Sequence, residues 1–146
     1  MIPPYAKNGN LPQGIHIASW GEIVCRFGTN SHRRRLLRGL YRALQSLINA
    51  GCEVIYIDGS FVTAKEEPLD FDCCWEVDSV ALDLLDEVLT DFTKGQARQK
   101  RKFGGELFPL LPALTGEQTI LEWFQTDKHT GKAKGIVCLR LREIDD

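Results

Sequence analysis

Residues 53–76, reading EVIYIDGSFVTAKEEPLDFDCCWE, carry the pattern that decides the fold. Residues 54–57 are β-branched or aromatic, which favours a strand. Residues 58–60, Asp-Gly-Ser, predict a tight turn, because glycine adopts backbone angles that other residues avoid. After a polar loop, residues 70–75 read as a second strand that contains two aspartates. The stretch therefore predicts a strand, a turn, a loop and a second strand.

The two aspartates, Asp70 and Asp72, stand two residues apart on the second predicted strand. Side chains at this spacing point to the same face of a strand, roughly 6–7 Å apart. Carboxylates in an otherwise apolar run are costly unless a cation compensates them, and Mg²⁺ prefers such hard oxygen ligands. Gly59 lets the backbone approach a ligand closely, and Ser60 offers a hydroxyl and an N–H group to a phosphate. The sequence therefore predicts a metal and phosphate site.

The Gly59-Ser60 pair, followed at this distance by Asp70-x-Asp72, resembles the signature of the DNA polymerase beta-like nucleotidyltransferase superfamily. That match covers about residues 31–110. Nearly the whole chain, from the opening Ile2-Pro3-Pro4 and Asn8-Gly9-Asn10-Leu11-Pro12 to Lys134-Gly135-Ile136, further resembles a small, poorly characterised family of prokaryotic nucleotidyltransferase-like proteins. The resemblance implies an α+β fold in which helices flank a mixed, nucleotidyltransferase-like β-sheet.

The same resemblance implies a minimal nucleotidyltransferase that uses Mg²⁺ or Mn²⁺ to transfer a nucleoside monophosphate from a nucleoside triphosphate to a protein or RNA acceptor. Asp70 and Asp72 would hold the metal ions, and Gly59 and Ser60 would hold the triphosphate. A protein acceptor would make the chain similar to antitoxins that modify a partner toxin. The alternative is a catalytically silent member of the fold that acts, for example as an antitoxin, by protein–protein contact.

Lys65 marks a departure from the superfamily pattern. Many small members carry an arginine and a glycine soon after the Gly-Ser pair, where this chain has Thr63-Ala64-Lys65. Lys65 is then the candidate to supply the positive charge beside the nucleotide.

The third metal-facing carboxylate has two candidates. Residues 103–108 read as a further strand, and Glu106 stands at a distance from Asp72 where the superfamily often places a third acid. Its competitor, Glu122, lies in the β-prone run 119–126 and shares a strand face with two apolar residues, which is a costly place for an unused charge. Both candidates remain open at this point.

The helices are predicted from capping and periodicity. Ser19 and Glu22 have capping-box spacing before a short helix, and apolar residues at spacings of three and four predict a longer helix over residues 31–50. Leucines and a valine predict another helix over residues 80–92. The basic segment 93–102 reads as a loop or a helix end that could approach a polyanion.

Several arginines gather near the start of the longer helix. Arg34, Arg38 and Arg42, at i, i+4 and i+8, predict one exposed stripe. Such a stripe is either a solvated face or a contact surface for an acidic partner or a nucleic acid. Residues 135–141 predict a final strand, paired with 119–126 as a C-terminal hairpin.

Composition bounds the class of protein. The 146 residues are 43% hydrophobic and 26% charged, which is typical of a single globular domain over residues 1–146, with residues 1–14 as an extended N-terminal arm. A net charge of −2 does not indicate a protein that coats nucleic acid. Apolar runs fall short of the ~20 residues of a membrane span, so no membrane partner is expected. Five scattered cysteines predict neither a zinc site nor disulfides, and we expect a cytoplasmic protein.

Overall fold

The computed structural model describes residues 1–111 and 134–144. Within them lie three α-helices and a five-stranded sheet. The helices are α1 (Trp20–Phe27), α2 (Ser31–Asn49) and α3 (Thr93–Phe103). The strands are β1 (Gly14–Ile17), β2 (Val54–Asp58), β3 (Phe71–Glu76), β4 (Gly105–Leu110) and β5 (Gly135–Arg140).

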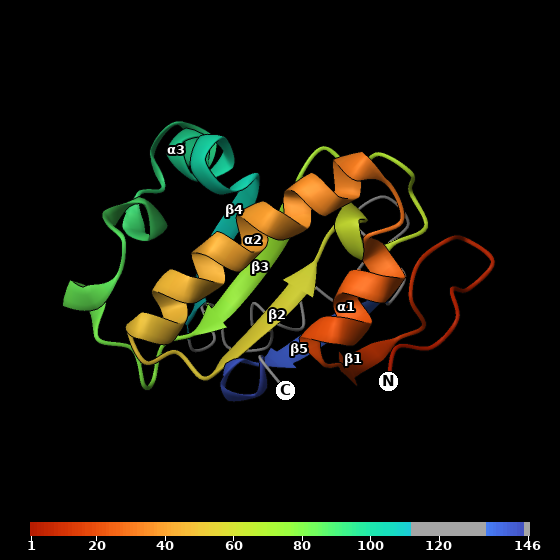
Figure 1. Ribbon diagram of the computed structural model, residues 1–146, viewed down its shortest axis with the longest axis horizontal. Helices are drawn as coiled ribbons and strands as arrows, with labels where there is room; N and C mark the ends of the chain where they lie inside the picture. Colours follow the sequence, from red (N-terminus) through yellow and green to blue (C-terminus); the bar gives the residue numbers. More distant parts are fainter. Residues whose placement is uncertain (112–133, 145–146) are drawn as a thin grey trace.

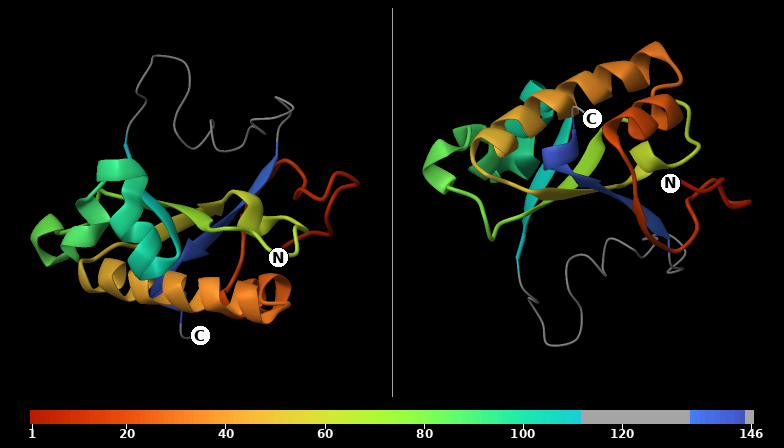
Figure 2. Two further views of the ribbon diagram at one scale, coloured as in Figure 1. Left: turned by 90° about the horizontal axis from the view of Figure 1, so that it is seen from above. Right: turned by 60° about the horizontal axis from the view of Figure 1, so that its bottom comes forward.

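The sheet is mixed, with the order β1-β5-β2-β3-β4. The pairs β1–β5 and β3–β4 are parallel, whereas β2 is antiparallel to both of its neighbours. Helices α1 and α2 lie on the same face of this sheet, and α3 lies beside the β4 edge (Figures 1 and 2). The prediction of an α+β domain with a mixed sheet is therefore confirmed.

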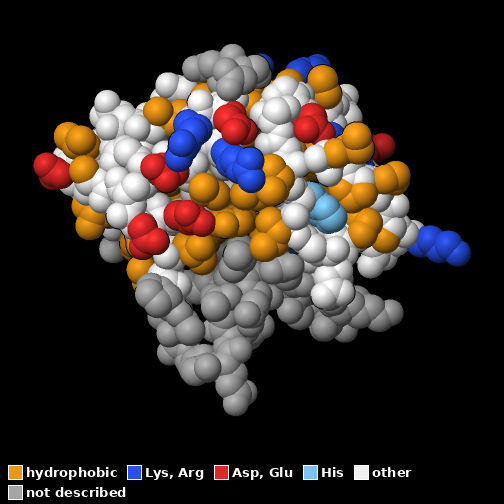
Figure 3. All heavy atoms as spheres, turned by 90° about the horizontal axis from the view of Figure 1, so that it is seen from below, with side chains coloured by type: hydrophobic (Ala, Val, Ile, Leu, Met, Phe, Trp, Pro, Cys, Tyr) orange, Lys and Arg blue, Asp and Glu red, His pale blue; other side chains and the backbone are white. Residues whose placement is uncertain are grey.

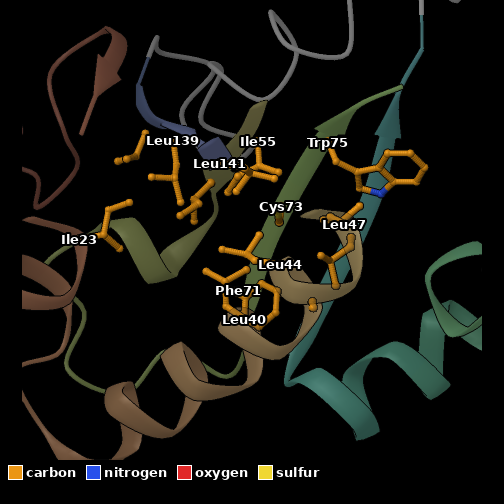
Figure 4. Close-up of a cluster of buried hydrophobic side chains, with 14 of the residues drawn as sticks. Ile23, Leu40, Leu44, Leu47, Ile55, Phe71, Cys73, Trp75, Leu139 and Leu141 are labelled. Carbon is orange, nitrogen blue, oxygen red and sulfur yellow. The ribbon is translucent and has the colours of Figure 1, made fainter. Parts of the chain in front are cut away.

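The core lies between α2 and the sheet. Leu40, Leu44 and Leu47 of α2 are fully buried, and they face Ile55 of β2 and Phe71 of β3 (Figure 4). The spacing of the leucines places them on one side of the helix, and strand alternation sends every second residue of β2 and β3 towards them. This packing defines two sheet faces: the helix-covered face and the opposite face, called here the far face.

The capping signals act as the sequence predicts. Ser19 and Glu22 form a reciprocal capping box at the start of α1, and the Asn30 side chain caps α2 by accepting from the Arg33 N–H group at 2.8 Å. Gly51 follows α2 with φ of +94°, the left-handed conformation expected just after a helix.

The N-terminal arm enters the core instead of only covering the surface. Ile2 and Leu11 are buried, at 7% and 2% exposure. The arm then leads into the four-residue strand β1, which the sequence analysis does not predict. Its isoleucines Ile15 and Ile17 are exposed at the sheet edge. The Met1 ammonium group donates to the Ile17 carbonyl at 2.6 Å, which ties the start of the arm to that edge.

The predicted helix over residues 80–92 is wrong. The structure has two 3₁₀ turns there, Leu82–Leu84 and Glu87–Thr90. Asp86 separates them, because its N–H group donates to the Ser46 hydroxyl at 2.9 Å and its carboxylate accepts from the Val88 N–H group at 3.0 Å. An aspartate that caps the following turn ends any continuous helix at this point.

Residues 93–102, predicted as a loop or a helix end, lie in α3, in which residues 94–96 have left-handed backbone angles ahead of the regular helix. Two buried glutamines hold α3 to the edge strand β4. Gln99 accepts from the Leu107 N–H group at 2.7 Å, and Gln96 donates to the Leu107 carbonyl at 3.2 Å. These side chains satisfy edge groups that a further strand would otherwise pair. The helix lies beside β4 for that reason.

The final strand is confirmed as β5, which lies between β1 and β2. Its predicted hairpin partner, residues 119–126, lies outside the described residues. None of the described helices is long and apolar enough to cross a membrane.

Candidate functional site

Three carboxylates stand in register across neighbouring strands. Asp58 of β2 pairs with Asp72 of β3, and Asp72 pairs with Glu106 of β4. Residues in register on adjacent strands point to the same face and are separated by about 4.7–4.9 Å. Since Phe71 and Cys73 belong to the core, Asp72 and its two partners point to the far face. We call Asp58, Asp72 and Glu106 the carboxylate row.

Asp70 stands two residues before Asp72, directly ahead of β3, and like Asp72 it is partly buried. Its charge and that of Asp72 both act on Lys100, so the two aspartates lie near the same ammonium group. The structure thus brings the predicted residues Asp70, Asp72 and Glu106 to one place on the sheet.

Asp58 is the carboxylate that sequence reasoning missed. It is 5% exposed and forms an ion pair with Lys134, with Nζ 3.2 Å from Oδ1. The strand alternation of residues 54–58 contained a signal for Asp58. Ile55 and Ile57 are buried on the helix-covered face, so the next residue, Asp58, points to the far face. Because Asp58 stands directly before the Gly-Ser pair, the sequence pattern assigns it to the turn.

Gly59 brings the backbone against the row. Its φ of +82° and ψ of −170° are angles that essentially only glycine adopts. A Cβ atom at this position would lie 2.3 Å from Oδ2 of Asp72, which is closer than atoms can approach. Ser60 then begins a short 3₁₀ turn that is closed by the Val62 N–H group donating to the Gly59 carbonyl at 3.2 Å. The predicted Gly-Ser turn therefore lies directly beside Asp72.

Arg33 holds the loop that joins the turn to Asp70. Its guanidinium group is buried at 2% exposure and donates to the carbonyls of Phe61 at 2.7 Å, Thr63 at 2.8 Å and Lys65 at 3.1 Å. Burial lowers the pKa of the Arg33 guanidinium below its ordinary value. The sequence placed Arg33 within an arginine cluster on the helix surface, so its structural role was missed. Its position, three residues after the N-cap residue Asn30, gives no signal that distinguishes it from the neighbouring arginines.

Lys65 reaches this network only through its backbone. Its carbonyl accepts from Arg33, whereas its side chain is exposed. Within the described residues its ammonium group forms no ion pair. The structure does not bring the Lys65 side chain to the carboxylates.

Two other lysines do face the carboxylates. Lys100 of α3 lies 2.9 Å from Glu106, and Lys134 pairs with Asp58. The hydrogen bond to Glu106 is the main cause that raises the pKa of Lys100, and the charges of Glu106, Asp70 and Asp72 add to it. Four carboxylates and two ammonium groups leave an excess of negative charge in this cluster. A cation is the ligand that such an excess favours.

The rest of the basic segment lies elsewhere. Arg98 pairs with Glu87 and Asp91, and Lys102 pairs with Asp86, so these two side chains contact acids outside the carboxylate row. The arginine stripe belongs to α2, which covers the opposite face of the sheet from the carboxylate row. The surface seen from below mixes acidic and basic side chains around an apolar area (Figure 3).

The cluster fits a hard divalent cation in its donor chemistry, since Asp58, Asp70, Asp72 and Glu106 offer carboxylate oxygens. As the side chains stand, however, no three histidines, cysteines or acids among the described residues converge tightly enough to hold a metal ion. Lys100 contacts Glu106 instead. Binding would therefore require this ion pair to open. The alternative ligand Glu122 lies outside the described residues.

Residues 3–140 match the model of DUF6932, whose description is a family of unknown function. No curated protein and no solved structure matches the chain. The family match spans nearly all of the described strands and helices. The chain, with its carboxylate row, therefore belongs to the DUF6932 family of unknown function.

Proposed function

We propose that this protein is a minimal nucleotidyltransferase that moves a nucleoside monophosphate from a nucleoside triphosphate to a protein or RNA acceptor. The observation that supports the proposal is the carboxylate row across β2, β3 and β4, with Asp70 beside it and the Gly59 backbone against Asp72. Three strands and a glycine turn converge on one cluster of acids. A purely structural role does not require acids at adjacent register positions, because their mutual repulsion is destabilising.

In this proposal Asp70, Asp72 and Glu106 hold Mg²⁺ or Mn²⁺, and the Gly59-Ser60 turn binds the triphosphate. The absence of a side chain at Gly59 lets the Asp72 carboxylate lie directly against the turn, so a metal ion on Asp72 and a phosphate on the turn would be neighbours. The bound cation would neutralise charge on the phosphates and on the leaving pyrophosphate. The acceptor hydroxyl oxygen bonds to the α-phosphorus, the bond to pyrophosphate breaks, and a nearby carboxylate accepts the hydroxyl proton.

Lys100 and Lys134 replace Lys65 as the cations of the site. Both already contact carboxylates of the row. With those carboxylates bound to a metal ion, the two ammonium groups would be available to pair with phosphate oxygens. Lys65 would contribute through the loop backbone that Arg33 holds.

A silent binding module is the second candidate. The Lys100–Glu106 ion pair favours it, because the lysine ammonium group within the carboxylate cluster can supply the positive charge that a metal ion would otherwise supply. In that case the protein would act through contact with a protein partner, such as a toxin, and the row would serve only to hold α3 against β4.

Transfer of label separates the two candidates. The protein is incubated with each α-³²P-labelled nucleoside triphosphate, Mn²⁺, and protein and RNA fractions in turn. The proposal predicts label on one fraction, at least about 100-fold less label with Asp72→Asn, and unchanged label with Glu67→Gln. Glu67 is the control, since it is an exposed acid in the loop that precedes β3. Absence of label with every triphosphate, or equal label with Asp72→Asn, would leave only the silent module.

A further inference from the structure

A groove lies between α1 and α2, on the outer side of the helices and away from the carboxylate row. Its volume is about 440 Å³. Trp20, Val24, Leu37 and Tyr41 supply its apolar lining. The rings of Trp20 and Tyr41 pack on each other at 5.5 Å with a tilt of 45°. The two rings therefore present a bent apolar surface. Such a surface suits aliphatic side chains better than a planar nucleobase.

The arginine stripe (Arg34, Arg38 and Arg42) lines the same groove. None of the three pairs with an acid in the described part of the chain, although Arg34 and Arg42 each donate to a backbone carbonyl. Like charges spaced four residues apart on a helix repel one another. An occupant with carboxylates would relieve that repulsion, so the groove favours an acidic, aliphatic segment.

The described surface contains a segment with that chemistry. In the 3₁₀ turn Leu82–Leu84, called here the leucine turn, Leu82 is 62% exposed and Leu84 is 52% exposed. Asp83 stands between them, and Asp78 precedes the turn; both are exposed. Neither aspartate forms an ion pair within the residues that the structure describes. The turn thus presents aliphatic side chains flanked by carboxylates.

We propose that the groove of one molecule receives the leucine turn of a second molecule. Leu82 and Leu84 would fill the apolar floor, and Asp83 and Asp78 would pair with the arginine stripe. The turn lies at the opposite end of the molecule from α1 (Figure 1), so a single chain cannot place its own turn in its own groove. The contact joins two different surfaces, so it can repeat into rings or open chains, or be made reciprocally in a two-fold dimer.

Sedimentation velocity over a range of protein concentrations tests this contact. Wild type should gain apparent mass as concentration rises, and added salt should reduce the gain because ion pairs contribute. Arg38→Glu disables only the groove, and Asp83→Lys disables only the turn. Each variant alone should associate at least about tenfold more weakly, since like charges then face each other.

An equimolar mixture of the two variants gives the sharpest outcome. Arg38→Glu keeps a working turn and Asp83→Lys keeps a working groove, and the exchanged charges at positions 38 and 83 also attract each other, so the mixture should recover the association that each variant alone lacks. Both positions are exposed, and circular dichroism should show that both variants fold. Wild type that remains monomeric at every concentration overturns the proposal, even if a foreign acidic peptide binds the groove. A mixture no heavier than its two components overturns it as well.

Discussion

Replacement of Arg33 by methionine should lower the free energy of unfolding by roughly 3–5 kcal/mol. The guanidinium group is buried and donates to carbonyls of Phe27, Phe61, Thr63 and Lys65. Methionine fills similar space but donates nothing, so several loop carbonyls lose their partners. Asn30 would then be left to hold this loop from the start of α2, through its bond to Glu66, together with the neighbouring contact of His32 with Pro68.

Urea denaturation measures this loss, and Arg35→Met is its control. Arg35 stands two residues further on, is exposed, and should cost no more than about 0.5 kcal/mol. Equal stabilities of the two variants would show that the loop between the Gly-Ser turn and Asp70 does not depend on Arg33.

Alanine at position 59 should destabilise the fold and disable the site together. Left-handed strain at such a φ costs roughly 1–3 kcal/mol. The new Cβ would in addition meet Oδ2 of Asp72 at 2.3 Å, so either the turn or the carboxylate must move. We therefore expect a loss beyond the strain alone, accompanied by loss of metal binding.

Gly9→Ala separates strain from collision. Gly9 has φ of +84°, nearly that of Gly59, but a Cβ there would meet only Ala64 at an ordinary 3.6 Å. Thermal unfolding of both variants should show the larger loss for Gly59→Ala, and only this variant should lose its response to Mn²⁺. If both variants lost equal stability and kept that response, Asp72 would not be held where the Gly59 backbone approaches it.

Local patterns predicted the elements whose signals are local. The capping box at Ser19, the leucine periodicity of α2 and the alternation within β2 and β3 each depend on residues close in sequence. The segments whose structure was predicted wrongly or incompletely depend on partners that are distant in the sequence. Asp86 ends a helix-like pattern because Ser46, forty residues earlier, accepts its N–H group. Helix α3 forms beside β4 because Gln99 reaches Leu107.

The site divides in the same way. Strand alternation was enough to predict that Asp70 and Asp72 belong together, but Asp58 joins them only through the register between β2 and β3. Glu106 was favoured by its distance along the chain, and its alignment with Asp72 depends on the parallel pairing of β3 and β4. Lys100 could not be foreseen, because its contact with Glu106 requires α3 to fold against the sheet edge.

The melting temperature with and without Mn²⁺ tests the central claim, that the carboxylate row and Asp70 form a divalent cation site. A metal ion that binds only the folded protein adds about 2.7 kcal/mol of stability at about a hundred times its Kd. For a chain of this length that is a rise of several degrees. The account predicts this rise for wild type and Glu67→Gln, and its loss in Asp70→Asn and Asp72→Asn. A wild type indifferent to Mn²⁺, or a rise that persists undiminished in Asp72→Asn, would contradict it.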